Sequence, residues 1–364
     1  MQPPRKVDDR RDGASIGATP PPSGESALFD LPDAAPWTGS WRPLVAGWLI
    51  GLVILGGLTV FVLRFGVFEV FVTALQQADP LWLAAAAICQ IGTYAAAAAV
   101  WFRILKRAGA PLRFRSLLVL ALVELFANQA IPTGGLSGSL MVMQGLVRRK
   151  VAAATAMTAL LVTTLSYYAA YVLVAVAAFV LLWSSGDLSS AWQGLLAICV
   201  AAVAALGIAL VVLTRVRGDL IPDTILRWRP IARFAGMLDH LRFDLLHDPR
   251  LVAEAIVWQV VIFGLDATTL WCTGRAVGLH VAIGGSFTSF VLASVVATLS
   301  PTPLGLGSFE GSCTGLLHLL GGGLEASLAA TLLLRGLTLW LPMLPGLWLI
   351  RREVVVQSTI NSAT

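Results

Sequence analysis

Apolar residues follow one another along this chain in long runs, without the short alternation of apolar and polar positions that half-buried strands show. Several runs reach about 20 residues, which as a helix is enough to cross a hydrocarbon core roughly 30 Å thick. We therefore predict an all-α, polytopic helical membrane protein. Six full spans are expected, at residues 44–63, 82–102, 152–182, 192–213, 251–271 and 326–350.

Two more apolar stretches, residues 116–147 and 286–320, are each interrupted near their middle by proline and glycine. Each arm has only about 12 to 16 residues, too few for a helix to make a full crossing. We therefore predict two re-entrant hairpins, although two short spans in place of each would leave the rest of the topology the same. The two breaks read Ile131-Pro132-Thr133-Gly134-Gly135-Leu136-Ser137-Gly138-Ser139 and Ser300-Pro301-Thr302-Pro303-Leu304-Gly305-Leu306-Gly307-Ser308.

The ends of the chain differ from its middle. Residues 1–43 carry mixed charges and a proline-rich stretch with little apolar periodicity, so they cannot form a core. We expect residues 1–43 to be a disordered cytoplasmic tail, residues 44–352 to be the transmembrane domain, and residues 353–364 to be a short cytoplasmic tail.

Charge adds the orientation. Of the 364 residues 57% are hydrophobic and only 12% are charged, about half the charge of a soluble globular protein, which excludes an ordinary soluble enzyme. With the N-terminus inside, 22 of the 25 basic residues fall on the cytoplasmic side, as membrane insertion favours. This pattern explains the basic residues better than nucleic-acid binding does. We expect a bacterial inner-membrane protein with both termini cytoplasmic, whose first hairpin enters from the cytoplasm and second from outside.

The sequence also suggests an internal repeat. A shift of 169 residues places Trp82 on Leu251 and the first hairpin on the second. An odd number of crossings separates the two copies, so they would be inverted. Inverted repeats with broken helices are frequent in transporters, where the breaks bind substrate. The alternative is that glycine and proline at the breaks only allow helices to pack closely.

Four ionisable residues lie inside apolar segments, where each costs about 2.5 to 3.5 kcal/mol to insert. Glu310 follows the second break, and Arg335 lies in the last span at a depth compatible with an ion pair. This pair could hold the second hairpin to the last helix or bind substrate directly. Glu124 lies in the first hairpin. Asp266 could relay protons or, more economically, pair with Arg275.

Polar side chains gather at the two breaks. Asn128 and Gln129 come just before the first break, and such groups must face protein or water because lipid offers them no partners. Helices beginning at Gly135 and Gly305 would point free N–H groups toward the same cavity, which suits an anionic headgroup. Helix capping or packing is the alternative role for each nearby hydroxyl. These hydroxyls belong to Thr133, Ser137, Ser139, Thr302 and Ser308.

Aromatic residues and the loop before residue 249 carry further expectations. Tyr167, Tyr168 and Tyr171 predict an aromatic cluster on the third crossing, with a packed or an amphipathic lining role. Residues 223–248 predict an amphipathic helix that lies on the inner leaflet or docks a partner. Tryptophans near the predicted ends of spans predict an interfacial belt. They are Trp41, Trp82, Trp101, Trp183, Trp192 and Trp271.

The four cysteines are isolated, and the four histidines show no pair at metal-binding spacing, so no metal or other cofactor is expected.

The two breaks together resemble the motifs of the flippase-like integral membrane family, which includes the membrane domain of lysylphosphatidylglycerol synthases. The resemblance covers residues 44–352, and its more specific part is the second break with Glu310 and the later Arg335. It implies movement of a lipid headgroup between leaflets, with these two residues at matching positions. The first break lacks the acidic residue of many members. Because the sequence ends soon after Ile350, we expect no aminoacyl-transfer activity.

We therefore expect a lipid flippase or scramblase-like transporter whose partners are membrane lipids, with an anionic or lipid-linked substrate, and not an enzyme. The sequence holds no P-loop, so net direction would come from an ion gradient, a partner or consumption of lipid on one side. Two alternatives stay open. One is a secondary transporter of a soluble solute, and the other is a non-transporting partner of a lipid or glycan biosynthesis enzyme, for example of hopanoids. A homo-oligomer is compatible with all three.

Overall fold

The computed structural model describes residues 67–130, 136–184, 243–246, 248–300 and 305–340, with single positions at 194, 201 and 205. All of these belong to one compact unit, Gly66–Thr364. Their regular elements are helices throughout. The two predicted tails and the predicted first span at 44–63 lie outside the described residues, as does nearly all of the span predicted at 192–213.

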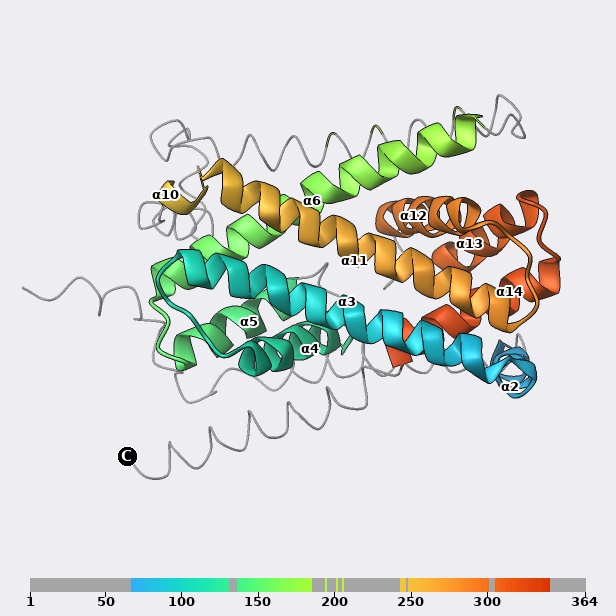
Figure 1. Cartoon of the computed structure of the whole chain (residues 1–364), viewed down its shortest axis with the longest axis horizontal. Coiled ribbons are helices and arrows are strands. Elements are labelled where there is room, and N and C mark those ends of the chain that lie inside the picture. The colour runs from blue at the N-terminus through green and yellow to red at the C-terminus, as the bar shows by residue number, and fades with distance from the viewer. Residues whose placement is uncertain are drawn as a thin grey trace, which may run out of the picture. The chain divides into compact units, whose positions relative to one another are not determined.

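Three helices are long and apolar enough to cross a membrane among the residues that the structure describes: α3 (Pro80–Arg107), α6 (Ala153–Ser184) and α11 (Pro249–Ala276). The 28 residues of α3 and of α11 correspond to about 42 Å of helix, more than the hydrocarbon core requires. These helices match the spans predicted at 82–102, 152–182 and 251–271, and they confirm a helical membrane protein. Figure 1 shows all three running along its horizontal axis.

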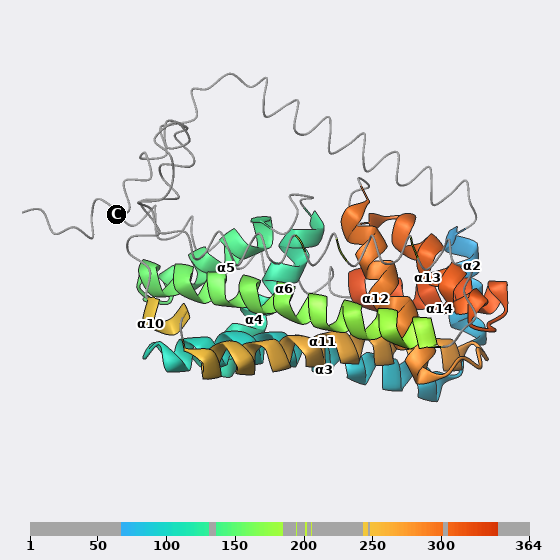
Figure 2. The same ribbon diagram turned by 90° about the horizontal axis from the view of Figure 1, so that it is seen from above.

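Helices α3 and α11 lie side by side and antiparallel, as the views in Figures 1 and 2 agree. At one end Nε of Arg107 lies 2.9 Å from Oδ2 of Asp248. At the other end the N–H of Asp79 donates to the carbonyl of Ala276 over 2.9 Å. The rings of Trp82 and Trp271 also meet edge to face near that end, with centroids 5.2 Å apart.

Both helices start in the same way, with an aspartate followed by proline. The carboxylate of Asp79 accepts from the N–H of Leu81 at 2.8 Å, and that of Asp248 accepts from the N–H groups of Arg250 and Leu251. Asp79 thus caps one of the unpaired N–H groups at the start of its helix, and Asp248 caps two. The proline fits the first helical position because it has no N–H to lose. The two starts are separated by the 169 residues that the sequence comparison used.

The two predicted hairpins appear as two pairs of shorter helices. The first pair is α4 (Phe114–Ala130) and α5 (Leu136–Arg148), and the second is α12 (Ile283–Leu299) and α13 (Ser308–Leu319). In Figure 1 the outer ends of the first pair lie at the left, beside the end of α3, and those of the second pair lie at the right, beside the end of α11. Helices α4 and α12 have 17 residues each, about 26 Å, so neither spans the core alone.

Small residues let the arms of each hairpin pack closely. A Cβ on Gly145 of α5 would clash with Leu120 of α4, and one on Gly285 of α12 would lie 3.3 Å from Leu320, just beyond α13. In both cases the contact joins the outer part of one arm to the outer part of the other. Each pair of helices therefore turns back to the end from which it came.

The remaining described elements are short. Helix α2 (Val67–Gln77) packs against α14 (Leu324–Arg335), which continues as a π-helical turn, Gly336–Trp340. Helix α14 and the π-helical turn form the described part of the span predicted at 326–350. Helix α10 (Phe243–Leu246) lies before α11. Its Leu245 is only 4% exposed and belongs to the core around α3, α4 and α6, so this part of the predicted amphipathic helix faces protein and not the lipid surface.

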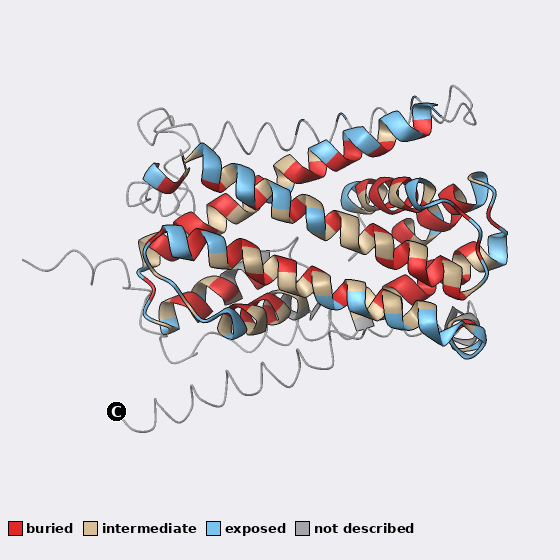
Figure 3. Cartoon of the chain, in the orientation of Figure 1, coloured by how far each residue is buried: buried red, intermediate tan, exposed pale blue. Residues whose placement is uncertain are grey.

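Burial separates the inward and outward faces of the long helices, as the stripes in Figure 3 show. Alanines such as Ala98, Ala159 and Ala255 are fully buried where helices meet, whereas Ile88 and Val257 are more than 60% exposed. Large exposed apolar side chains on three long helices suit a surface that faces lipid. Trp101 is an exception to the predicted tryptophan belt, because it is only 2% exposed and lies inside the core.

The turn before α13 depends on glycine. Gly305 has φ 64° and Gly307 has φ 82°, in the left-handed region where side chains are strained. Helix α13 therefore begins at Ser308, after both glycines, and not at Gly305 as predicted. The described part of α5 begins at Leu136, and the predicted start at Gly135 lies outside the described residues.

Replacing Gly305 with alanine should destabilise the protein more than replacing Gly307. Both changes put a Cβ at positive φ, at about 1–2 kcal/mol. At Gly305 the new Cβ would also lie 2.5 Å from Cβ of Ala297, whereas at Gly307 nothing lies within 4 Å. Overpacking of this kind adds about 1–3 kcal/mol. Thermal unfolding of the two purified variants in the same detergent checks this, and equal losses would contradict the close packing of the turn on α12.

Asp248 should make α11 sensitive to acid. The Arg107 guanidinium beside Asp248 holds the pKa of that carboxyl below its usual range, so the carboxylate stabilises the fold at neutral pH and loses this effect as the pH falls through its folded pKa. Asp248→Asn keeps a good N-cap but removes the charge. Its midpoint of thermal unfolding should lie below that of the wild type at neutral pH and approach it in acid. The matched control is Asp79→Asn at the other cap, and a gap between wild type and Asp248→Asn that does not change with pH would contradict the ion pair.

Candidate functional site

Glu310 and Arg335 form an ion pair inside the helical bundle. Nε of Arg335 lies 2.8 Å from Oε1 of Glu310, and the two side chains are 12% and 17% exposed. Glu310 lies in the first turn of α13, directly after the second break, and Arg335 is the last residue of α14. The pair therefore joins α13, the second arm of the second hairpin, to α14, as the sequence predicted.

The second oxygen of Glu310 holds the turn at the break. The N–H of Gly307 donates to Oε2 of Glu310 over 2.7 Å, which is the half of a capping box that a glutamate at the third helical position supplies. The hydroxyl of Ser308 donates to the carbonyl of Gly305 at 2.9 Å. The start of α13 is therefore organised by its own glutamate and is not the open anion-binding end that was predicted at Gly305. The Ser308 hydroxyl thus has a structural role at the helix start, which was the alternative to substrate binding in the sequence analysis.

The Arg335 guanidinium has a specific surrounding. Its central carbon lies 4.2 Å from the centroid of the Phe309 ring, and Nη2 lies 3.5 Å from the carbonyl oxygen of Gly305. A cation over an aromatic face is stabilised by the ring, more strongly where water is excluded. Removing one member of such a buried pair leaves the other charge uncompensated, at about 3–5 kcal/mol. The charge of Arg335 can therefore be balanced by Glu310, or by another anion that replaces this carboxylate.

Asp266 lies in a separate polar cluster between α11 and α3. The hydroxyl oxygen of Thr93 lies 3.2 Å from Oδ1 of Asp266, and the side chain of Gln90 is near enough to interact electrostatically with this carboxylate. The expected pairing of Asp266 with Arg275 is wrong. The two residues are nine positions apart on one straight helix, about 13 Å along its axis. Arg275 instead lies over the ring of Trp271, 5.5 Å from its centroid.

Glu124 has a third environment, in the first hairpin. The indole N–H of Trp101 on α3 donates to Oε2 of Glu124 over 3.3 Å. This contact explains why Trp101 is buried and not in an interfacial belt, since its ring faces α4 and its N–H has a partner there. A single neutral donor compensates a carboxylate less than the guanidinium at Glu310 does.

The structure thus distributes the predicted site residues. It brings together Glu310, Arg335 and Ser308, while Glu124 and Asp266 have partners of their own. Asn128 and Gln129 lie in the last turn of α4, just before the first break, and their side chains are outside the described residues. Thr133 and Thr302, at the two breaks, also lie outside them.

The aromatic cluster on α6 is confirmed as a packed one. The ring of Tyr171 stacks on that of Phe263 of α11, with centroids 5.2 Å apart, and its hydroxyl lies 3.1 Å from that of Thr298 on α12. Tyr167 contacts both rings.

Sequence reasoning missed the residues of α3 that serve as partners: Gln90, Thr93 and Trp101. A signal for Gln90 was present, because it is an amide in the middle of an apolar span and Gln259 stands at the equivalent position of α11. Both glutamines are at least 95% buried. Nothing in the sequence marks Trp101 as a partner of Glu124, because the contact depends on how α4 folds back on α3.

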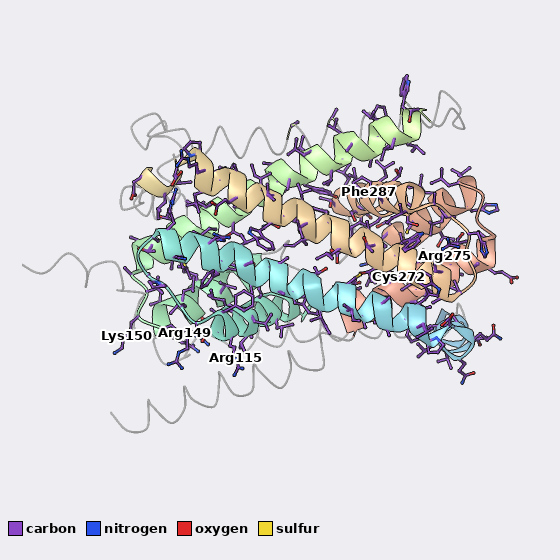
Figure 4. All side chains as sticks on the ribbon, in the orientation of Figure 1. Arg115, Arg149, Lys150, Cys272, Arg275 and Phe287 are labelled. Carbon is purple, nitrogen blue, oxygen red and sulfur yellow. The ribbon has the colours of Figure 1, made fainter. Side chains whose placement is uncertain are left out.

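The ends of the bundle differ in charge. Nine of the eleven lysines and arginines that the structure describes lie toward the end where Arg107 meets Asp248. Arg115, Arg149 and Lys150 lie at that end in Figure 4, whereas Arg275 lies at the other. The nine are Arg103, Lys106, Arg107, Arg113, Arg115, Arg148, Arg149, Lys150 and Arg250.

As for metals, no cluster of three or more His, Cys, Asp or Glu side chains occurs within the described ranges.

Comparison with known proteins gives the same picture of the chain's membrane region. The family model described as the lysylphosphatidylglycerol synthase TM region matches residues 48–346. No curated protein sequence matches the chain. The family suggests a function related to membrane lipids. Since the match takes in every described helix, both hairpins and the Glu310–Arg335 pair, the chain belongs to the family of the lysylphosphatidylglycerol synthase TM region.

Proposed function

We propose that this protein moves an anionic lipid headgroup between the leaflets of the membrane, as a flippase or scramblase-like transporter. The observation that carries the proposal is the buried Glu310–Arg335 ion pair at the break of the second hairpin. Charged groups inside a membrane are costly and are usually retained for function, and broken helices are where transporters bind their substrates.

The pair suggests how a headgroup could cross. A phosphate presents two oxygens that match the planar guanidinium, so it can replace the carboxylate of Glu310 at Arg335. Glu310 would then keep its second contact, with the N–H of Gly307. An exchange of this kind leaves no uncompensated cation at any stage. The tails of the lipid would stay in the bilayer while the headgroup passes between the helices.

We further propose that the segments with α3 to α5 and α11 to α13 are inverted copies of one unit. Helices α3 and α11 have equal lengths, as do α4 and α12, and each pair is separated by the same 169 residues. Their hairpins enter from opposite ends of the bundle (Figure 1). Two inverted units offer a binding site near the middle with alternating access to the two sides.

Orientation follows from charge. We propose that the basic end of the bundle faces the cytoplasm, in a bacterial inner membrane, because Lys and Arg in short loops stay on that side. The partners would then be membrane lipids, and no covalent reaction is assigned to the protein. Lipid that enters from one leaflet would meet Arg335 from between the helices.

Leaflet exchange of fluorescent lipids tests the function. In liposomes with purified protein and a quencher confined to the outside, fluorescent phosphatidylglycerol should exchange faster than in empty liposomes, and faster than a neutral lipid. Arg335→Met should slow the protein-dependent exchange about tenfold or more, because a charge-assisted hydrogen bond contributes about 1.5–3 kcal/mol. Glu325→Gln is the matched control, since Glu325 is an exposed acid in the first turn of α14.

A double variant separates transport from folding. Glu310→Gln together with Arg335→Met removes both charges, so no buried charge is left unpaired, and glutamine still suits the capping position. We expect this variant to melt at a higher temperature than Arg335→Met alone and yet to lack protein-dependent exchange. Exchange at the wild-type rate in the double variant would show that the pair only holds α13 to α14, and the proposed function would lose its main support.

A further inference from the structure

Asp266 is an intramembrane carboxylate that the proposed route for the headgroup does not use. It is the eighteenth of the 28 residues of α11, about 15 Å from the last residue of that helix. Its partner Thr93 lies at the middle of α3. The carboxylate is therefore placed where the two long helices cross the membrane, well inside both of their ends.

No cation faces this carboxylate from the described residues around it. Thr93 of α3 lies within hydrogen-bonding distance of it, and the other groups that interact with it electrostatically are Gln90 and Tyr94 of α3 and Tyr167 of α6. Helix α12 carries no titratable residue between Ile283 and Leu299. Of the charged groups on the other elements packed against α11, Arg335 pairs with Glu310 and the rest lie toward helix ends. They are Asp79, Arg103, Lys106 and Arg107 on α3 and its cap, Asp244 on α10 and Glu325 at the start of α14. The other titratable side chains, Cys89 on α3 and Tyr168 and Tyr171 on α6, are not cations.

The polar neighbours of Asp266 can serve two states of the carboxyl group. The Thr93 hydroxyl has two acceptors within reach, Oδ1 of Asp266 at 3.2 Å and the carbonyl of Cys89 at 3.3 Å, but only one hydrogen to donate. Gln90 is 3% exposed, and its Oε1 atom has no hydrogen-bond partner. The side-chain amide can donate to a carboxylate, or turn and accept from a carboxylic acid.

From this arrangement we propose that Asp266 is a proton-binding site within the membrane, with Thr93 and Gln90 as the groups that adapt to its protonation. In the ionised state Thr93 and the amide of Gln90 donate to the carboxylate. When a proton from water binds one carboxylate oxygen, the new O–H donates to Oε1 of Gln90, and the Thr93 hydroxyl donates to Cys89 instead. Every donor and acceptor named then has a partner in one of the two states, and apart from the water that gives up the proton no other group gains or loses one.

This site goes beyond the proposed lipid movement and does not depend on it. A carboxyl group that takes up a proton inside the membrane loses a charge whose insertion costs about 2.5–3.5 kcal/mol, so the protonated state favours close packing of α3 on α11. The ionised state favours access of water to the same place. The proton thus binds one arrangement of the two central helices better than another, which is the requirement for a ligand to shift their equilibrium.

Infrared difference spectroscopy on the protein in lipid bilayers tests the site without any transport assay. With carbon-13 in the side-chain carboxyl of aspartate, the band of a protonated Asp separates from those of Glu and of ionised groups. We expect a protonated-Asp band at neutral pH, weaker at alkaline pH, that is lost in Asp266→Asn. Glu124→Gln, which changes the other intramembrane carboxyl whose described partner is a neutral donor, should leave this band unchanged. Gln90→Leu should shift it to higher frequency, because the acid loses its acceptor.

Two results would overturn the proposal. The first is an identical protonated-Asp band in the wild type and in Asp266→Asn, which would assign the proton elsewhere. The second is the absence of such a band at every pH at which the protein stays folded, as checked by circular dichroism on the same samples. A band that is present but does not move in Gln90→Leu would remove Gln90 from the site.

Discussion

The antiparallel contact between α3 and α11 is the feature on which the rest of the described structure depends. It is closed at one end by Arg107 and Asp248, and at the other by the N–H of Asp79 on the carbonyl of Ala276. Because the two helices run in opposite directions, the chain leaves them at opposite ends of the bundle (Figure 1). Each hairpin follows its own long helix, so the two hairpins must approach from opposite sides. The inner ends of α4 and α12 then both lie toward the middle of the bundle (Figure 1).

Hydrocarbon offers no hydrogen bonds, and this constraint explains how the polar residues are arranged. Three acids have different partners: Glu310 has a cation and a backbone donor, Glu124 has an indole N–H, and Asp266 has a hydroxyl beside a glutamine side chain. The first solution keeps a charge in place and suits exchange with another anion. The third has no fixed charge nearby and suits the gain and loss of a proton. The partners of each carboxyl group therefore decide whether it suits exchange with another anion, as at Glu310, or protonation, as at Asp266.

Much of this structure is visible in the order of residues alone. Apolar runs predicted α3, α6 and α11 to within a few residues, and proline and glycine predicted the division of α4 from α5 and of α12 from α13. Errors arose where a prediction needed to know which face of a helix meets which neighbour. Trp101 was assigned to the interface from its distance along a span, but its side chain faces α4. Asp266 was assigned to Arg275 on its own helix, although its partners lie on α3.

The sequence by itself determined that the protein is helical and lies in a membrane, because helix length and apolar composition are local properties that the bilayer selects. It also marked Glu310 and Arg335, because a charge in an apolar run stands out without any structure. Only the tertiary structure decided the partners of Glu124 and Asp266 and the start of α13 after Gly307. These depend on contacts between segments far apart in the chain, and a partner 173 residues away, as Thr93 is from Asp266, leaves no mark in the local pattern.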